Sequence, residues 1–406
     1  PDFNQLSSTE KDSIRDSWEE NYIELQNWWL QLMDDSGMNI TEMMVLFWHD
    51  HFATSAQVIK FTPSMYLQNQ LIRNYAIGNF KDLVKSINYD PAMLQWLDND
   101  QNYFVNDNNF TFNENYAREL LELFTMGEGN YSQFDIEETA RALTGIYTDG
   151  INSVYSPTRH DHGDKTIFGE TGDIGIDELI DLIFEQSEPS LFICRKLYKW
   201  FVYEIPDEDI VEQMAEELIQ NNYEIEPVLR LLFLSEHFYD INFRGAKYKN
   251  PIWFSLSTFR QLYTEPENRN EFILWYNWIL GQAIFHPPDV SGWDGYRSWV
   301  NTFTLPYRKL YSNQVVDGYQ NSISEWGNVL EFAERFSEPN NPELLIIEMV
   351  DYLLPIQPSP QTIDLLIEEL LDGSEVYDWY LYNEGSDQRL KTVIKHIMRL
   401  EEFQLR

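Results

Sequence analysis

Histidine is the side chain whose charge changes closest to neutral pH, so its placement is a first guide to chemistry in an unfamiliar chain. Only seven histidines occur among the 406 residues, and four of them form two His-Asp-His triplets, at residues 49–51 and 160–162. Imidazole and carboxylate groups are common acid–base catalysts and metal ligands. The two triplets therefore mark the first places to look for a site.

The spacing within the first triplet limits what it can do. Residues 41–56 have helical periodicity, and side chains two positions apart on a helix point about 200° away from each other. His49 and His51 therefore cannot both bind one metal ion. We expect one ring to pack in the core with its nitrogen satisfied and the other to face a polar cluster, and both are candidate catalytic residues.

The second triplet lies in residues 146–176, where Gly, Asp, Tyr and Thr dominate and helical periodicity disappears. A long loop or a small β-hairpin is expected there, and loops of this length often carry function. His160 and Asp161 are candidate catalytic residues, and Lys165 is a candidate for holding a substrate.

A charged helix should stand beside these groups. Asn113 is a favourable N-cap for a helix that runs from Glu114 to Met126. Arg118 and Glu119 lie on it among apolar residues that leave little of its surface for solvent, so some of its charges should be buried or lie in a cleft. A carboxylate in low-dielectric surroundings can act as a general acid. Glu114 and Glu119 are thus candidate acids or bases.

Several standard motifs are absent from the sequence: GxxxxGK[ST], GxGxxG after a strand, GxSxG and HExxH. Their absence disfavours P-loop nucleotide hydrolysis, Rossmann cofactor binding, the α/β-hydrolase triad and a zincin site. No D-x-[DN]-x-[DN]-G calcium loop occurs either. No cofactor can be named from the sequence.

The charge balance excludes further classes of partner. Lys and Arg number 28 against 67 Asp and Glu, which gives a net charge of −39. Such a surface repels phosphate backbones, so nucleic acid is not an expected partner. No apolar run approaches the ~18–20 residues of a membrane span. The one cysteine, Cys194, sits in an apolar run and is expected to be a buried, inert thiol.

Periodicity elsewhere predicts an all-α fold, a multi-helix globule with two long irregular segments at 146–176 and 286–312. The first helix should open at Ser7, with Glu10 completing a capping box. We expect residues 1–312 to form one helical domain with the 146–176 loop inserted, and residues 313–406 to form a C-terminal helical part. Further helices are expected near 41–56, 66–87, 91–97, 114–126, 135–145, 177–186, 189–204, 207–220, 225–236, 250–264, 321–336, 342–354, 360–371 and 387–404.

Eight ordered blocks of sequence resemble one family: residues 47–54, 73–80, 90–94, 113–120, 140–145, 160–161, 163–166 and 288–293. Together they resemble the DUF 1800 family, large bacterial proteins of unassigned function that are commonly exported, over roughly residues 28–310. The family's usual His-Leu-Leu-Arg-Arg-like opening is missing, and His162 and His286 fall where no family histidine is expected, which counts against a metal site built on them.

The resemblance implies a bacterial protein in the periplasm or secreted, with its leader absent from this chain. It transfers no catalytic residue. It does imply that the matching blocks, which mix aromatic rings with His, Arg, Asn and Glu, surround a site.

Three hypotheses follow. The first is a hydrolase or lyase acting on a glycan or another polar polymer. In this hypothesis His49, His51, His160, Asp161, Glu114 and Glu119 supply acid–base chemistry, Arg73, Asn113, Arg118, Arg141 and Lys165 bind substrate, and Trp293 stacks on a sugar or aromatic ring.

The second hypothesis is a non-catalytic binding or scaffold protein of the envelope, in which the same polar groups form internal salt bridges. The third is a metalloprotein that uses the histidines together with the carboxylates. We assign no metal ligands from the sequence.

Overall fold

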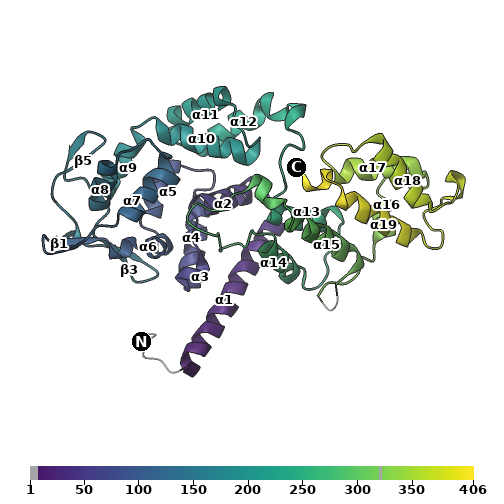
Figure 1. Ribbon diagram of the computed structural model, residues 1–406, viewed down its shortest axis with the longest axis horizontal. Helices are drawn as coiled ribbons and strands as arrows, with labels where there is room; N and C mark the ends of the chain where they lie inside the picture. Colours follow the sequence, from purple (N-terminus) through teal and green to yellow (C-terminus); the bar gives the residue numbers. More distant parts are fainter. Residues whose placement is uncertain (1–7, 320–321) are drawn as a thin grey trace. The chain divides into compact units, whose positions relative to one another are not determined.

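The computed structural model describes residues 8–319 and 322–406. The fold is mostly helical, with 60% of residues in helices and 6% in strands that form small hairpins (Figure 1). The expected all-α class is confirmed. Ser7, the expected start of the first helix, lies outside the described residues. No helix in the described ranges is both long enough and apolar enough to cross a bilayer.

The chain forms two compact units. The first comprises the residues up to Phe238 together with Ile284–Trp293, and the second comprises Tyr239–Ala283 together with Asp294–Arg406. The predicted boundary at residue 312 falls inside helix α15 of the second unit. All the candidate site residues belong to the first unit.

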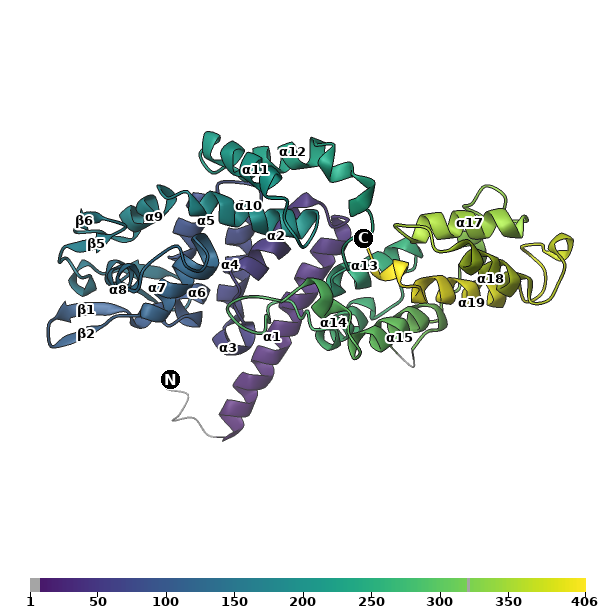
Figure 2. The same cartoon turned by 45° about the horizontal axis from the view of Figure 1, so that its top comes forward.

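The first unit consists of helices and three two-stranded antiparallel hairpins at one end of it, at the left in Figures 1 and 2. Its helices are α1 (Ser8–Asp35), α2 (Ile40–His51), α3 (Ala56–Ile59), α4 (Thr62–Asn74), α5 (Phe80–Ile87), α6 (Pro91–Trp96), α7 (Glu114–Glu119), α8 (Gln133–Ala142), α9 (Ile176–Phe184), α10 (Glu188–Phe201), α11 (Glu208–Gln220) and α12 (Ile225–Leu234). The hairpins are β1 (Tyr103–Asn106) with β2 (Asn109–Thr111), β3 (Ile146–Thr148) with β4 (Ser153–Tyr155), and β5 (Lys165–Ile167) with β6 (Glu170–Gly172).

The second unit is helical throughout its ordered elements: α13 (Pro251–Gln261), α14 (Arg269–Ile279), α15 (Thr304–Asp317), α16 (Val329–Ala333), α17 (Pro342–Leu353), α18 (Pro360–Leu371) and α19 (Ser386–Arg399). A fully buried guanidinium lies in its core. Arg308 donates to the carbonyls of Trp299 and Lys249 at 3.0 and 2.8 Å. These bonds satisfy a cation that would otherwise be very costly to bury.

Helix α2 lies at the centre of the first unit's core. Asn39 caps it by accepting a hydrogen bond from the amide of Glu42 at 3.0 Å. Its Trp48 is completely buried, stacks on Phe52 and Phe80, and donates its indole N–H to the Ala76 carbonyl at 2.9 Å. Eight of the twelve residues of this helix are buried, His49 and His51 among them, so the two rings must find hydrogen-bond partners inside the protein.

The helix after Asn113 begins as expected, since the Asn113 side chain accepts from the Tyr116 amide at 3.0 Å. It does not stay α-helical to Met126. Regular α-structure ends at Glu119, and residues Leu120–Thr125 form a π-helix. Such segments are rare and often occur at functional sites.

Two segments contain more regular structure than their composition indicates. Residues 98–112 are rich in Asn and Asp, yet they include the β1–β2 hairpin, because Phe104, Phe110 and Phe112 pack on one another at ring distances of 4.8–6.2 Å. In the 286–312 segment, α15 already begins at Thr304. The side chain of Asn301 accepts from the first amides of this helix.

Replacing Trp48 with alanine tests how far the first unit depends on α2. We expect the free energy of unfolding to fall by about 3–5 kcal/mol, the usual cost of removing a large buried ring. Urea denaturation followed by circular dichroism measures it. Phe134→Ala removes a ring that is 54% exposed and should change stability by no more than about 0.5 kcal/mol. Equal losses in the two variants would contradict the central role of α2.

Candidate functional site

His49 is sealed inside the protein. Its ring is 1% exposed and packs against Trp29, Phe285 and Trp293. The backbone N–H of Phe285 donates to His49 Nε2 at 3.1 Å, so this nitrogen carries no proton. Burial lowers the pKa of His49 to about 3. Of the two histidines on α2, this is the one that packs in the core as a neutral ring.

His51 is also buried among aromatic rings, at 2% exposed, but unlike His49 it contacts a charged side chain. Its Nε2 lies 3.1 Å from the Phe124 carbonyl, which can only accept, so the ring proton is on Nε2. Its Nδ1 then accepts a hydrogen bond from Lys196 Nζ at 2.8 Å. Burial, and next the nearby ammonium of Lys196, hold the pKa of His51 well below its usual value. His51 thus links the π-helix to Lys196 on α10.

Asp50 lies between the two histidines and is only half-buried. Its carboxylate accepts the backbone N–H of Trp293 at 2.7 Å. Low-dielectric surroundings raise the pKa of Asp50 to about 6, against the opposing effects of that hydrogen bond and the charge of Lys196. Burial likewise lowers the pKa of the half-buried Lys196 to about 8. A carboxyl and an ammonium in one cluster therefore titrate on either side of neutral pH.

A close backbone approach holds the 284–293 loop against Asp50. Gly292 has φ of +85°, and a Cβ built on it would lie 2.3 Å from Asp50 Oδ1. Only glycine fits this position. Trp293 is 7% exposed, with its ring beside His49 rather than open to solvent.

Glu119 borders the same region. It is half-buried, and its pKa is raised first by burial and then by the negative charges of Glu122 and Asp289, while Arg118 acts in the opposite direction. Asp289 belongs to the loop that ends on Asp50, so one loop influences both carboxyl groups.

Three other predicted residues lie on α7 or at its N-cap. Glu114 is exposed and accepts from the Gln133 side chain at 3.0 Å, and Arg118 donates to the same side chain at 3.3 Å. Asn113 is used by its own helix cap and by the Leu97 carbonyl. Glu114 and Arg118 thus link α7 to the start of α8 through one side chain, Gln133.

The predicted substrate-binding arginines have carboxylate partners within the chain. Arg73 is paired with Glu42. Arg141 bonds Glu138 at 2.8 Å and Asp161 at 2.7 Å, which ties the 160s loop to α8. The guanidinium of Arg141 offsets the effect of burial and lowers the pKa of Asp161.

His160 and Lys165 lie in the same loop region. His160 is 5% exposed and bonds the Thr144 carbonyl through Nδ1 at 2.9 Å. Lys165 is completely buried, and its ammonium lies 3.1 Å from Asp173. The predicted residues therefore form two groups, one around α2 and one around the 160s loop.

A comparison with protein families identifies the chain. The model of a family described as a protein of unknown function (DUF1800) matches residues 2–405. The chain belongs to the DUF1800 family. Comparisons with curated proteins and with solved structures found no match. The family match extends beyond the 28–310 range of the sequence blocks and includes both units of the DUF1800 chain.

Asp90 is another carboxyl group with a raised pKa in this DUF1800 protein, but it has a structural role. Burial raises its pKa to about 7, but it is only 3% exposed. Its oxygen accepts from the Met93 amide and from Gln68, both at 2.8 Å, so it caps α6 and satisfies a buried side chain. Asp50 differs because its residue remains partly open to solvent.

Sequence reasoning missed Asp50 and Lys196. A signal for Asp50 was present, because the residue between two helical histidines points in a third direction, about 100° from each. No signal marked Lys196, which lies 145 positions from His51.

The raised pKa of Asp50 predicts a pH dependence of stability. A folded-state pKa above the ordinary value of 3.8 means that the native state holds the proton more tightly, so this contribution is lost as pH rises through about 6. The stability of the wild type relative to Asp50→Asn should therefore fall between about pH 4 and pH 7. Urea unfolding of both proteins across this range measures the difference. A difference that grows with pH would mean that pairing with Lys196 outweighs burial.

Proposed function

We propose that this DUF1800 protein is a hydrolase or lyase that uses Asp50 as its general acid. The observation that carries the proposal is the carboxyl group of a half-buried residue, Asp50, whose pKa burial raises to about 6, near an ammonium whose pKa burial lowers to about 8. Groups whose environments place their pKa values close to the working pH suit proton transfer. Structural carboxylates paired with cations usually have lowered values instead.

Each neighbour of Asp50 has a role in this proposal. The positive charge of Lys196 stabilises the negative charge that develops on the Asp50 carboxylate as its proton leaves. His51 positions Lys196 through its Nδ1 and is itself held by the Phe124 carbonyl. Glu119 is the second carboxyl, available as base or nucleophile, since glycosidic bonds are usually cleaved by carboxyl pairs.

The substrate class follows from charge. A net charge of −39 repels anionic polymers, so the proposal favours a neutral polar polymer such as a glycan. We place the reaction outside the cytoplasm, in the periplasm or the medium, where such polymers are met. The resemblance to commonly exported proteins supports this localisation.

One observation favours a second candidate, a non-catalytic envelope scaffold or binding protein. Arg73 and Arg141 have internal carboxylate partners, which is the arrangement expected if the polar blocks hold loops onto helices. Under this alternative the Asp50 cluster is also structural, and its substitution changes stability alone.

The proposal predicts a specific loss of activity. The full chain is assayed on xylan, mixed-linkage β-glucan and chitin, with reducing-end release as the measure of hydrolysis and ultraviolet absorbance of unsaturated product as the measure of elimination. Asp50→Asn should lower kcat about 100-fold or more, the usual contribution of a general acid. It keeps an oxygen for the Trp293 amide, so the loop remains bound.

Two further variants separate the alternatives. Glu226→Gln changes an exposed carboxylate on α12 that pairs only locally with Arg230, and it should keep full activity. Glu114→Gln tests the residue first suggested by the charged helix. A loss confined to Glu114→Gln, with Asp50→Asn fully active, would overturn the proposal. Absence of activity on all three polymers in the wild type would leave the scaffold as the better account.

A further inference from the structure

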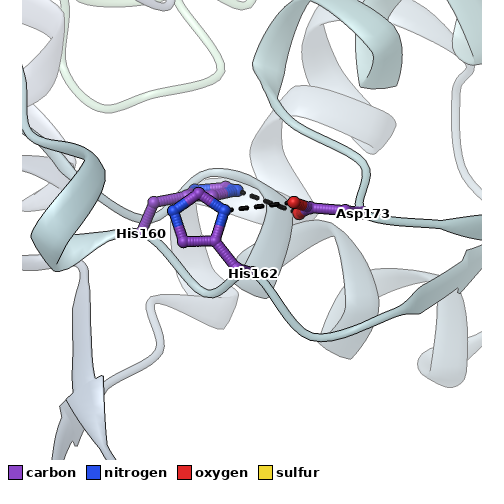
Figure 3. Close-up of side chains that lie close together, drawn as sticks. All are labelled: His160, His162 and Asp173. Carbon is purple, nitrogen blue, oxygen red and sulfur yellow. Dashed lines mark hydrogen bonds and ion pairs between the residues drawn. The ribbon is translucent and has the colours of Figure 1, made fainter.

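His160, His162 and Asp173 converge at the loop end of the first unit. One ligand atom from each lies within 4.8 Å of the others. His160 and His162 come from the segment that precedes β5, and Asp173 follows β6, so the β5–β6 hairpin brings them together. Figure 3 shows the two rings and the carboxylate directed toward one another.

The two histidines lie outside any helix, so their i, i+2 spacing does not force the rings apart. His160 has φ of −88° and ψ of 143°, which is extended. In extended chain, residues two positions apart point to the same side. The same i, i+2 spacing that separates His49 from His51 on a helix brings His160 and His162 together here.

The outer hydrogen bonds fix which nitrogen of each ring carries its proton. His160 Nδ1 lies 2.9 Å from the Thr144 carbonyl, and His162 Nε2 lies 3.0 Å from the Pro157 carbonyl. A carbonyl can only accept, so these two nitrogens are the donors. The lone pairs of the neutral rings are then on His160 Nε2 and His162 Nδ1.

Both lone pairs face the same carboxylate. His160 Nε2 is 3.7 Å from Asp173 Oδ1, and His162 Nδ1 is 3.0 Å from Asp173 Oδ2. Two acceptors facing each other repel unless a proton or a metal ion lies between them. The bond to Asp173 raises the pKa of His162, so at low pH a proton on His162 Nδ1 fills this role, and a metal ion would have to displace it. Lys165 Nζ lies 3.1 Å from Asp173 Oδ1 and orients the carboxylate.

We propose that His160 Nε2, His162 Nδ1 and the Asp173 carboxylate bind one Zn²⁺ ion. Two imidazoles and a carboxylate are a usual ligand set for catalytic zinc, which keeps a further position open for water or substrate. The bonds from the outer nitrogens to backbone carbonyls hold each ring in the orientation and tautomer that a metal ligand needs. The side chains of His162 and Asp173 are 56% and 48% exposed, so an ion can enter from solvent.

The site does not depend on the acid–base proposal for Asp50. It uses a different loop and none of the same side chains. Its positive neighbours are Lys165 and, through Asp161, Arg141. The ammonium of Lys165 lowers the affinity for a cation by repulsion, while its bond to Asp173 pre-orients one ligand.

The test is direct binding of Zn²⁺ to the full chain after removal of metal with a chelator. Isothermal titration calorimetry should show one tight site per chain, and added Zn²⁺ should raise the unfolding temperature, as any ligand that binds only the native state does. Co²⁺ in place of Zn²⁺ should give visible absorption bands of a low-coordinate ion. These readouts need no substrate, so they remain informative whatever the outcome for Asp50.

Variants assign the site. His162→Gln and Asp173→Asn should each weaken Zn²⁺ binding at least about tenfold to a hundredfold and remove the thermal shift. His286→Gln, which changes a half-buried histidine bonded to Ser55, should leave both unchanged. Circular dichroism confirms that each variant is folded. Absence of a tight site in the wild type, or equal binding by Asp173→Asn and the wild type, would overturn the proposal.

Discussion

The first unit depends on the burial of a polar helix end inside an aromatic core. Residues 49–51 sit at the end of α2, which is surrounded by apolar side chains. In such surroundings each polar atom must be bonded, because an unsatisfied one costs several kcal/mol. The partners come from remote parts of the chain: the amides of Phe285 and Trp293, the Phe124 carbonyl and the Lys196 ammonium. Satisfying three adjacent side chains thus brings together the π-helix, α10 and the 284–293 loop.

The same constraint gives neighbouring residues different properties. His49, His51 and Asp50 share one helical turn, yet burial makes His49 a neutral packing group and His51 a link to Lys196. Asp50 alone keeps partial access to solvent, and its carboxyl is the one whose pKa moves toward neutral. Position relative to the core, rather than residue type, separates the two packed histidines from the carboxyl that we propose as the general acid.

At the loop end of the first unit, around His160 and His162, the surroundings of the histidines differ from those on α2. There the two histidines lie outside any helix, the side chains of His162 and Asp173 are exposed, and the carbonyls of Thr144 and Pro157 fix the two histidine tautomers. Arg141 connects this loop to α8, because its guanidinium pairs with both Glu138 and Asp161. Arg73 also has an internal carboxylate partner, Glu42 on α2.

The sequence by itself determined the helical class, the cap at Asn113, the family and the separation of His49 from His51. These depend on local periodicity, capping chemistry and ordered blocks, which the chain carries without any long-range contact. It could not show that aromatic pairing would order residues 98–112, or that α7 would pass into a π-helix. Only the tertiary structure decided that Lys196 meets His51 and that Asp173 meets His160 and His162. These contacts depend on how segments that are far apart in the sequence pack together, and neither residue spacing nor composition predicts that packing.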